Sequence, residues 1–200
     1  IPELVDELGR VVQRVDEQRS ERPQAPVRLF VDRVFSITGA GTIVTGTLSS
    51  GSVSVGSELA RIGTDRSVAV RGVQRHGVEC DQVAAVSRIA VNLSGVSTAE
   101  LERGDALVEA GAWANTSVVD VVVELADGAS IRNGKGFSAY IGSARRDVSL
   151  RPVGGAENAH RNWYRMRFSN PLPLRPQDRL VLRDQGARDI VGVAVVNDVA

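Results

Sequence analysis

Apolar and polar residues alternate most regularly at the start of the strand-rich part of the chain. Between residues 27 and 37 the apolar positions recur at a period of two, as on the buried face of a β-strand: Val27, Leu29, Val31, Phe35 and Ile37. The cluster Thr38-Gly39-Ala40-Gly41 follows, and its glycines suit a tight turn because glycine adopts positive φ without steric cost. A β-branched stretch then runs from Thr42 to Leu48. The pattern predicts a β-hairpin that buries those apolar residues.

Arg33 interrupts this pattern, because it has the same parity as Val31 and Phe35. A guanidinium group that is buried without a partner is strongly unfavourable. Two interpretations are open. Either the strand bulges at Asp32-Arg33 and both side chains are re-aimed, or Arg33 points into a pocket that holds an anion.

The first part of the chain has a different period. Apolar residues fall at helical spacing over residues 1–19, and Pro2 suits a first helical turn, so we expect an amphipathic helix. Either its apolar face packs on the strand-rich part, or the helix is the last helix of a preceding domain. Two prolines within residues 21–26 indicate a linker. Because the chain begins with Ile1 in mid-pattern, we expect it to be a piece of a longer protein.

From residue 27 onward the pattern predicts only strands and turns. The strands expected after the hairpin share short β-branched runs bounded by glycine or polar turns, and they lie at 53–56, 68–73, 89–93, 106–108, 119–125, 137–141, 148–150, 163–168, 180–183 and 190–196. Many short strands at regular spacing indicate an all-β barrel or sandwich. A boundary is expected at 111–116, which gives a helix and linker over 1–22 and two β domains over 23–112 and 113–200.

Composition narrows the functional classes. The 24 basic residues balance the 24 acidic residues, so any contact with nucleic acid must come from local patches. Lys135 is the only lysine, and the other cations are arginines, whose planar fork suits phosphate and carboxylate. The single cysteine, Cys80, excludes an internal disulfide and fits a reducing, cytoplasmic location. With no long apolar run and no secretory signal at the start, no membrane partner is expected.

Signatures of catalysis are absent from the sequence. His76 and His160 lie far apart, and His76 with Cys80 supplies too few ligands for zinc. The turn at Gly39-Ala40-Gly41 lacks both the following helix of a dinucleotide loop and the Lys-Ser/Thr of a nucleotide P-loop. We therefore expect a binding module that is not itself an enzyme and holds no metal or cofactor.

Five stretches together resemble a known family, the translational GTPases. The opening V-D-R-V-F-S-I-T-G-A-G-T-I-V-T-G-T-L-S-S-G-S-V-S-V-G (31–56) and the motif E-L-E-R-G-D (100–105) look like the second domain of elongation factor Tu. The stretches V-R-G-V-Q-R-H-G (70–77) and S-R-I-A-V-N-L-S-G-V (87–96), with Asp32-Arg33, resemble one branch, the selenocysteine-specific elongation factors or SelB. The stretch F-S-N-P-L-P-L-R-P-Q-D-R-L-V-L-R-D (168–184) resembles the third domain of that branch.

This resemblance implies a fold and a set of partners. The fold would be two tandem β-barrels, a translation-factor barrel followed by an elongation-factor third domain. GTP, Mg²⁺ and the GTPase activity would belong to an N-terminal domain outside this sequence, and residues 1–22 would be the last helix of that domain and a linker. A C-terminal winged-helix region, also outside it, would bind a hairpin in the messenger RNA. The partners of the whole factor would be selenocysteyl-tRNA and the ribosome.

The resemblance also implies a pocket for the aminoacyl end of the tRNA, formed by Asp32, Arg33 and Arg88. Asp32 would accept hydrogen bonds from the α-ammonium group of the amino acid. The selenol is an anion at neutral pH, so the two arginines would favour it over the neutral hydroxyl of serine. Gln74 and His76 are expected at the rim of this pocket.

Plainer interpretations stand beside these. Asp32 and Arg33 would also fit a surface pair at a bulge, and Arg88 an ordinary strand-surface arginine. Four arginines of the second half are candidates for contact with the tRNA backbone, or else for a solvated outer face: Arg145, Arg146, Arg165 and Arg167. The alternatives for the whole chain are the barrels of another translational GTPase, an enzyme barrel that holds a flavin or substrate, and a structural interaction barrel.

Overall fold

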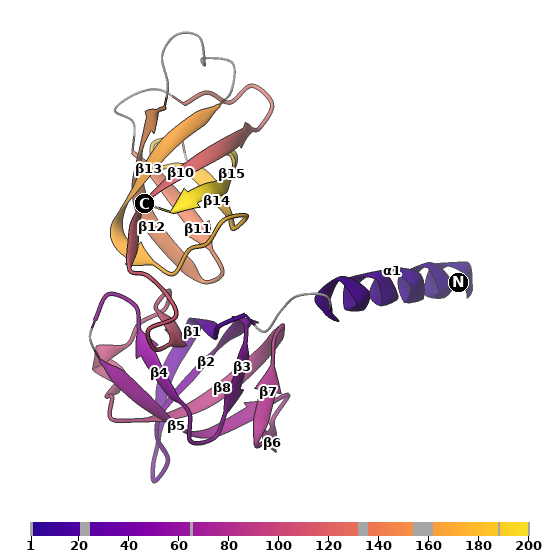
Figure 1. Cartoon of the computed structure of the whole chain (residues 1–200), viewed down its shortest axis with the longest axis vertical. Coiled ribbons are helices and arrows are strands. Elements are labelled where there is room, and N and C mark those ends of the chain that lie inside the picture. Colours follow the sequence, from indigo (N-terminus) through magenta and orange to yellow (C-terminus); the bar gives the residue numbers. More distant parts are fainter. Residues whose placement is uncertain are drawn as a thin grey trace.

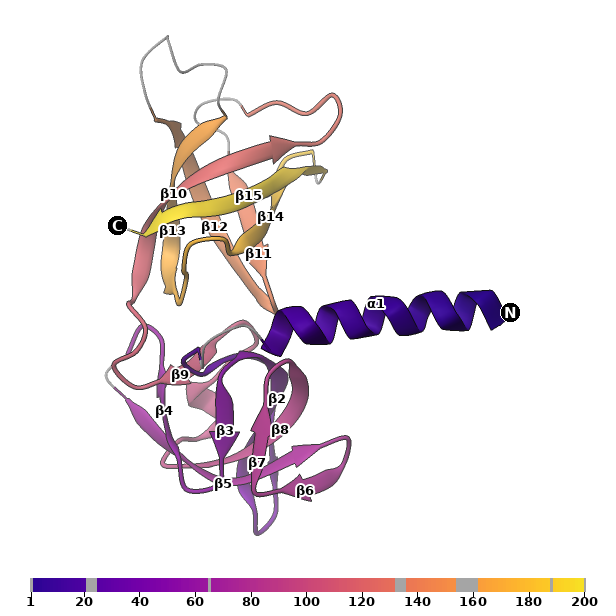
Figure 2. The same ribbon diagram turned by 45° about the vertical axis from the view of Figure 1, so that its right-hand side comes forward.

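The computed structural model describes residues 2–20, 25–64, 66–131, 136–153, 162–187 and 189–199. It contains one α-helix, α1 (Pro2–Ser20), and two β-barrels (Figures 1 and 2). The helix forms where the helical spacing predicts it. Its apolar stripe is exposed over the residues whose side chains are described, including Leu4, Leu8 and Val12. The stripe therefore does not pack on either barrel.

The first barrel closes through six strands in the order β4-β9-β1-β2-β8-β5, with β5 pairing back to β4. These strands are β1 (Arg28–Ile37), β2 (Gly41–Ser50), β4 (Glu58–Arg61), β5 (Ser67–Arg75), β8 (Ser87–Ser94) and β9 (Ala106–Glu109). Outside the closed ring, β6 (Val78–Cys80) extends β5 as a hairpin and β3 (Ser52–Ser54) pairs with β7 (Gln82–Ala84). A single 3₁₀ turn, η1 (Thr98–Glu100), precedes β9.

The second barrel is also closed by six strands, in the order β10-β13-β12-β11-β14-β15. They are β10 (Thr116–Leu125), β11 (Phe137–Ile141), β12 (Ala144–Pro152), β13 (Trp163–Leu172), β14 (Arg179–Asp184) and β15 (Ile190–Val199). Closure pairs every strand on both sides and leaves no open edge. The predicted class, all-β with two tandem barrels and a short N-terminal helix, is confirmed.

A β-bulge in β1 corrects the predicted burial of the hairpin. The register between β1 and β2 shifts between Val31, which faces Gly46, and Arg33, which faces Thr45, so Asp32 is the extra residue. Beyond the bulge Val34 packs against the core, while Phe35 and Ile37 are exposed. The prediction that Phe35 and Ile37 are buried is therefore wrong, because one inserted residue exchanges the two faces of the strand.

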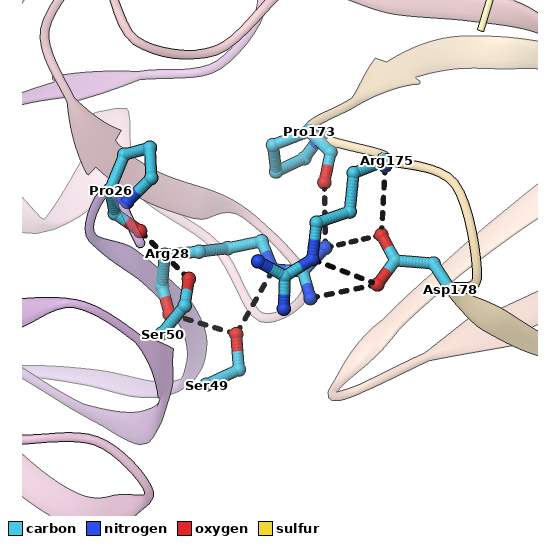
Figure 3. Close-up of polar contacts among 7 residues, drawn as sticks. All are labelled: Pro26, Arg28, Ser49, Ser50, Pro173, Arg175 and Asp178. Atoms are coloured by element: carbon cyan, nitrogen blue, oxygen red, sulfur yellow. Dashed lines mark hydrogen bonds and ion pairs between the residues drawn. The ribbon is translucent and has the colours of Figure 1, made fainter. Parts of the chain in front are cut away.

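The two barrels are joined by a buried ion pair between Arg28 of β1 and Asp178 at the entry to β14 (Figure 3). Arg28 Nη1 and Nη2 donate to the two carboxylate oxygens at 2.5 and 3.0 Å, and Nη1 also donates to the Pro173 carbonyl. The Arg28 guanidinium carbon lies 4.9 Å from the centre of the Trp113 ring. This planar, bidentate and stacked arrangement suits arginine in particular.

Candidate functional site: a charged group beside a hollow

Asp32 is the centre of the candidate site, and the bulge directs its carboxylate toward two arginines. Arg88 Nη2 donates to Asp32 Oδ2 at 2.8 Å, and Arg103 Nη1 lies 3.4 Å from Asp32 Oδ1. The hydrogen bond from Arg88 lowers the pKa of Asp32 below its ordinary value; burial opposes this shift in part, and the charges of Arg103, Arg88 and Arg33 add to it. Asp32 is therefore a carboxylate at neutral pH.

Gly46 makes room for this bulge. A Cβ atom at this position would lie 2.0 Å from the carbonyl oxygen of Phe30, so no larger residue fits between β1 and β8. Since Gly46 faces Val31 on one side and Ile89 on the other, it stands between the strands that carry Asp32 and Arg88. The glycine thus lets the backbone of β1 lie close to β2 at the bulge.

Arg33 follows the bulge on the exposed face of β1. Within the described residues no acidic side chain forms an ion pair with it, although its charge helps to lower the pKa of Asp32. Of the two interpretations drawn from the sequence, the structure has the bulge, and Arg33 is not buried. We call Asp32, Arg33, Arg88 and Arg103 the charged group.

A hollow of about 510 Å³ lies on the outer face of the same barrel. Its lining is part apolar, from residues such as Phe35 and Ile43, and part polar. The polar part comprises the amides of Gln74 and Asn92 and the charged side chains of Arg71, Glu79 and Asp81. The Oδ1 atom of Asn92 is buried and has no hydrogen-bond partner among the described residues. A ligand that donates a hydrogen bond would satisfy this acceptor.

The strand register places the charged group at the margin of the hollow. Arg33 faces Thr45, Thr45 faces Ala90, and Ala90 faces Gln74, so these residues form one row across the barrel. Arg88 lies two residues before Ala90 on β8 and therefore points to the same face. Asp32, Arg33, Arg88 and Gln74 thus share one surface, with the apolar lining beside the charges.

His76 lies apart from this arrangement. It occupies the turn between β5 and β6 with φ of 53°, is exposed, and does not line the hollow. The structure therefore places Gln74, but not His76, in the wall of the hollow.

The four arginines of the second barrel differ in their contacts. Arg165 donates two hydrogen bonds of 2.8 Å to Asp120, which lower the pKa of that carboxyl, while Arg145 lies near Ser138 and Asp147. Arg146 Nη2 donates to the Gly104 carbonyl of the first barrel at 2.9 Å. Arg167 is exposed and has no ion-pair partner within the described parts of the chain. Arg146 thus faces the other barrel, and Arg167 is the exposed arginine without a carboxylate partner among the described residues.

Arg103 is the member of the charged group that the sequence did not reveal. The motif E-L-E-R-G-D suggests a structural turn, and the structure does have a turn there. What brings Arg103 into the site is the hydrogen bonding of this turn to β1, in which Gly104 N donates to the Val31 carbonyl at 2.9 Å. That contact brings the neighbouring Arg103 to Asp32, and only the folded barrel shows it.

The chain is similar in sequence to known elongation factors. No protein-family model matches the chain. The selenocysteine-specific elongation factor of Escherichia coli is 33% identical over 186 residues, which cover 90% of this chain and 28% of that protein. The corresponding factor of Haemophilus influenzae is 28% identical over 202 residues. That of Desulfomicrobium baculatum is 48% identical over 80 residues. The chain spans less than a third of the length of these relatives.

Solved structures show the same fold. A crystal structure of a bacterial selenocysteine-specific elongation factor, EF-Sec, superposes with a TM-score of 0.80 over 96% of this chain and 31% of that chain, at 24% identity. The translation elongation factor SelB from Methanococcus maripaludis, in its apo form, gives a TM-score of 0.74 over 98% of this chain and 48% of that chain.

The tandem barrels are thus those of a translational GTPase. No helix among the described residues is both long and apolar enough to cross a membrane. Within the translational GTPases, the chain belongs to the selenocysteine-specific elongation factors, the SelB family.

Proposed function

We propose that this chain is the aminoacyl-tRNA-binding part of a factor that delivers selenocysteyl-tRNA to the ribosome in a GTP-dependent manner. The observation that carries the proposal is the charged group, in which one ionised carboxylate and three arginines lie beside a partly apolar hollow. GTP, Mg²⁺ and the GTPase activity belong to a domain that this chain does not include.

The chemistry of the ligand matches the charged group. Selenocysteine in ester linkage carries a free α-ammonium group and a selenolate, so it is a cation and an anion only a few bonds apart. Asp32, held ionised by Arg88, accepts hydrogen bonds from the ammonium group. Arg33 and Arg88 donate to the selenolate. A seryl ester offers no anion to either guanidinium. Because both charged donors are then left without a partner, the site discriminates strongly against serine.

The hollow suits the terminal nucleoside of the tRNA, which is covalently joined to the amino acid. Phe35 and Ile43 offer an apolar surface on which a base can stack, and Gln74 and Asn92 offer amide groups to its polar edge. The unsatisfied Asn92 Oδ1 would accept from an amino or hydroxyl group of the nucleoside.

The second barrel would bind the phosphate backbone of the same tRNA. Arg167 is the strongest candidate because it is exposed and free of ion pairs within the described parts, while Arg145 and Arg165 are exposed beside carboxylates. The messenger-RNA hairpin would bind to a part of the factor that this chain does not include. The cytoplasm, where translation takes place, is the proposed location.

Protection of the ester bond tests the pocket. In the full-length, GTP-bound factor, Arg33→Ala or Arg88→Ala should abolish protection of selenocysteyl-tRNA from hydrolysis and scarcely change the affinity for GTP. Arg179→Ala is the matched control, since Arg179 is an exposed arginine of the second barrel, paired with Glu124. Full protection in both pocket variants would overturn the assignment.

A further inference from the structure

The turn between β11 and β12 of the second barrel contacts the segment of β1 that leads into the charged group. Ser143 Oγ donates to the Val31 carbonyl at 2.5 Å. Val31 directly precedes the bulged residue Asp32. The second barrel therefore holds the backbone at the point where the first barrel turns its carboxylate outward.

Arg146 makes the parallel contact to the other side of the charged group. Its Nη2 atom donates to the Gly104 carbonyl at 2.9 Å, and Gly104 N donates in turn to the Val31 carbonyl at 2.9 Å. Arg103, which precedes Gly104, forms an ion pair with Asp32. Ser143 and Arg146 thus hold two backbone segments that meet at the Val31 carbonyl, and each segment carries one charge of the pair.

Both barrels use glycine where this contact is tightest. Gly142 has φ of 56°, and a Cβ atom there would lie 2.7 Å from Cδ2 of Phe30. Gly104 has φ of 91°, and a Cβ atom there would lie 3.1 Å from Cα of Ala144. Since each barrel has a glycine facing the backbone or ring of the other, the contact is close-packed and its two hydrogen bonds are held in place.

We infer that Ser143 and Arg146 of the second barrel are positioning residues, which fix Asp32 and Arg103 in the charged group. The site is then a property of the docked pair of barrels, although all four of its side chains belong to the first. Arg146, expected from the sequence to contact tRNA, acts through Gly104. Its effect on tRNA rests on the proposed function, whereas its effect on Asp32 does not.

The pH titration of the Asp32 carboxyl group, followed by ¹³C NMR on the 200-residue chain, tests this inference. In the combined Ser143→Ala/Arg146→Ala variant the titration midpoint should rise by about 0.5 pH unit, because the guanidinium groups of Arg103 and Arg88 are no longer held close to the carboxylate. Ser143→Thr retains the hydroxyl donor and should keep the original midpoint. The matched control is Ser149→Ala/Arg179→Ala, which alters an exposed serine and an exposed arginine of the second barrel and should also leave the midpoint unchanged.

An unchanged midpoint in the combined variant, with core methyl signals as in the wild type, would overturn the inference. Should the combined variant not fold, Ser143→Ala alone decides the matter. It removes one hydroxyl group, and we expect a smaller shift in the same direction; no shift would again overturn the inference.

A second readout separates this inference from the proposed function. In the full-length, GTP-bound factor the combined variant should lower ester protection about fivefold to tenfold. A shifted midpoint with full protection would support the positioning role and overturn the pocket assignment. Lost protection with an unchanged midpoint would overturn the positioning role.

Discussion

Two arginine–aspartate pairs begin on the same strand, four residues apart, and they differ in almost every physical respect. The pair formed by Arg28 and Asp178 has side-chain exposures of 6% and 8%, while for Asp32 and Arg88 these are 22% and 54%. Arg28 donates to Ser49, Pro173 and both oxygens of Asp178 (Figure 3). It also stacks on Trp113. Arg88 donates one hydrogen bond to Asp32.

We interpret the buried pair as structural and, under the proposed function, the exposed pair as part of the binding site. Around the buried pair the acceptors match the donors, and Asp178 Oδ2 also accepts from the Arg175 amide. Such a pair cannot exchange partners without a large desolvation cost. The exposed pair leaves donors of Arg88, Arg103 and Arg33 open to a ligand. Because solvent screens the charges, the exposed pair can change partners at a small electrostatic cost. The comparison therefore predicts opposite effects of mutation on stability and on binding.

The largest expected effect is on stability. Asp178→Ala leaves Arg28 buried without its carboxylate, and we expect a loss of about 3–5 kcal/mol in the free energy of unfolding. Urea unfolding of the variant and the wild type measures this loss. A loss below about 1 kcal/mol would mean that the Arg28–Asp178 pair contributes no more than an exposed ion pair, and the distinction between the two pairs would fail.

Asp32→Asn should change stability far less, by about 0.2–1 kcal/mol at neutral pH, as is usual for partly exposed pairs. The pKa of Asp32 is lowered in the folded state, so its contribution is fully present above the unfolded value and is lost as the pH falls through the folded value. The difference in unfolding free energy between wild type and variant should stay constant down to about pH 4 and shrink below the ordinary aspartate pKa of 3.8. If the difference in unfolding free energy instead grew as the pH fell, the predicted direction of the pH dependence would be wrong.

The smallest expected effect concerns the outer face of the second barrel. Arg167→Ala should weaken tRNA binding by the full-length factor and reduce the slope of log affinity against log salt by about one. Arg179→Ala should leave both quantities unchanged. Equal slopes for the wild type and the Arg167 variant would show that Arg167 makes no phosphate contact.

The sequence predicts the fold better than it predicts the site, and the bulge shows why. Alternation predicts the strand and shows that Arg33 breaks the pattern, and the glycines at 39 and 41 predict the turn. It cannot show that Asp32 is the inserted residue, because the register depends on pairing with β2, and so the predicted burial of Phe35 and Ile37 is wrong.

The contacts of Arg103 and Arg146 depend on structure of longer range. Arg103 reaches Asp32 across 71 residues of sequence, since its turn bonds back to β1, and Arg146 reaches Gly104 across the junction of the barrels. No local sequence pattern predicts either contact. The resemblance to translational GTPases directed attention to Asp32, Arg33 and Arg88, but not to the contacts that Arg103 and Arg146 make.

Discrimination between two amino acids on the same tRNA tests the central claim most directly. The measurement is the affinity of the full-length, GTP-bound factor for selenocysteyl-tRNA and for that tRNA carrying serine, in the wild type and in an Arg33→Ala/Arg88→Ala variant. We predict a preference of at least about 100-fold in the wild type that falls below about tenfold in the variant. A preference of the same size in both proteins would contradict the account.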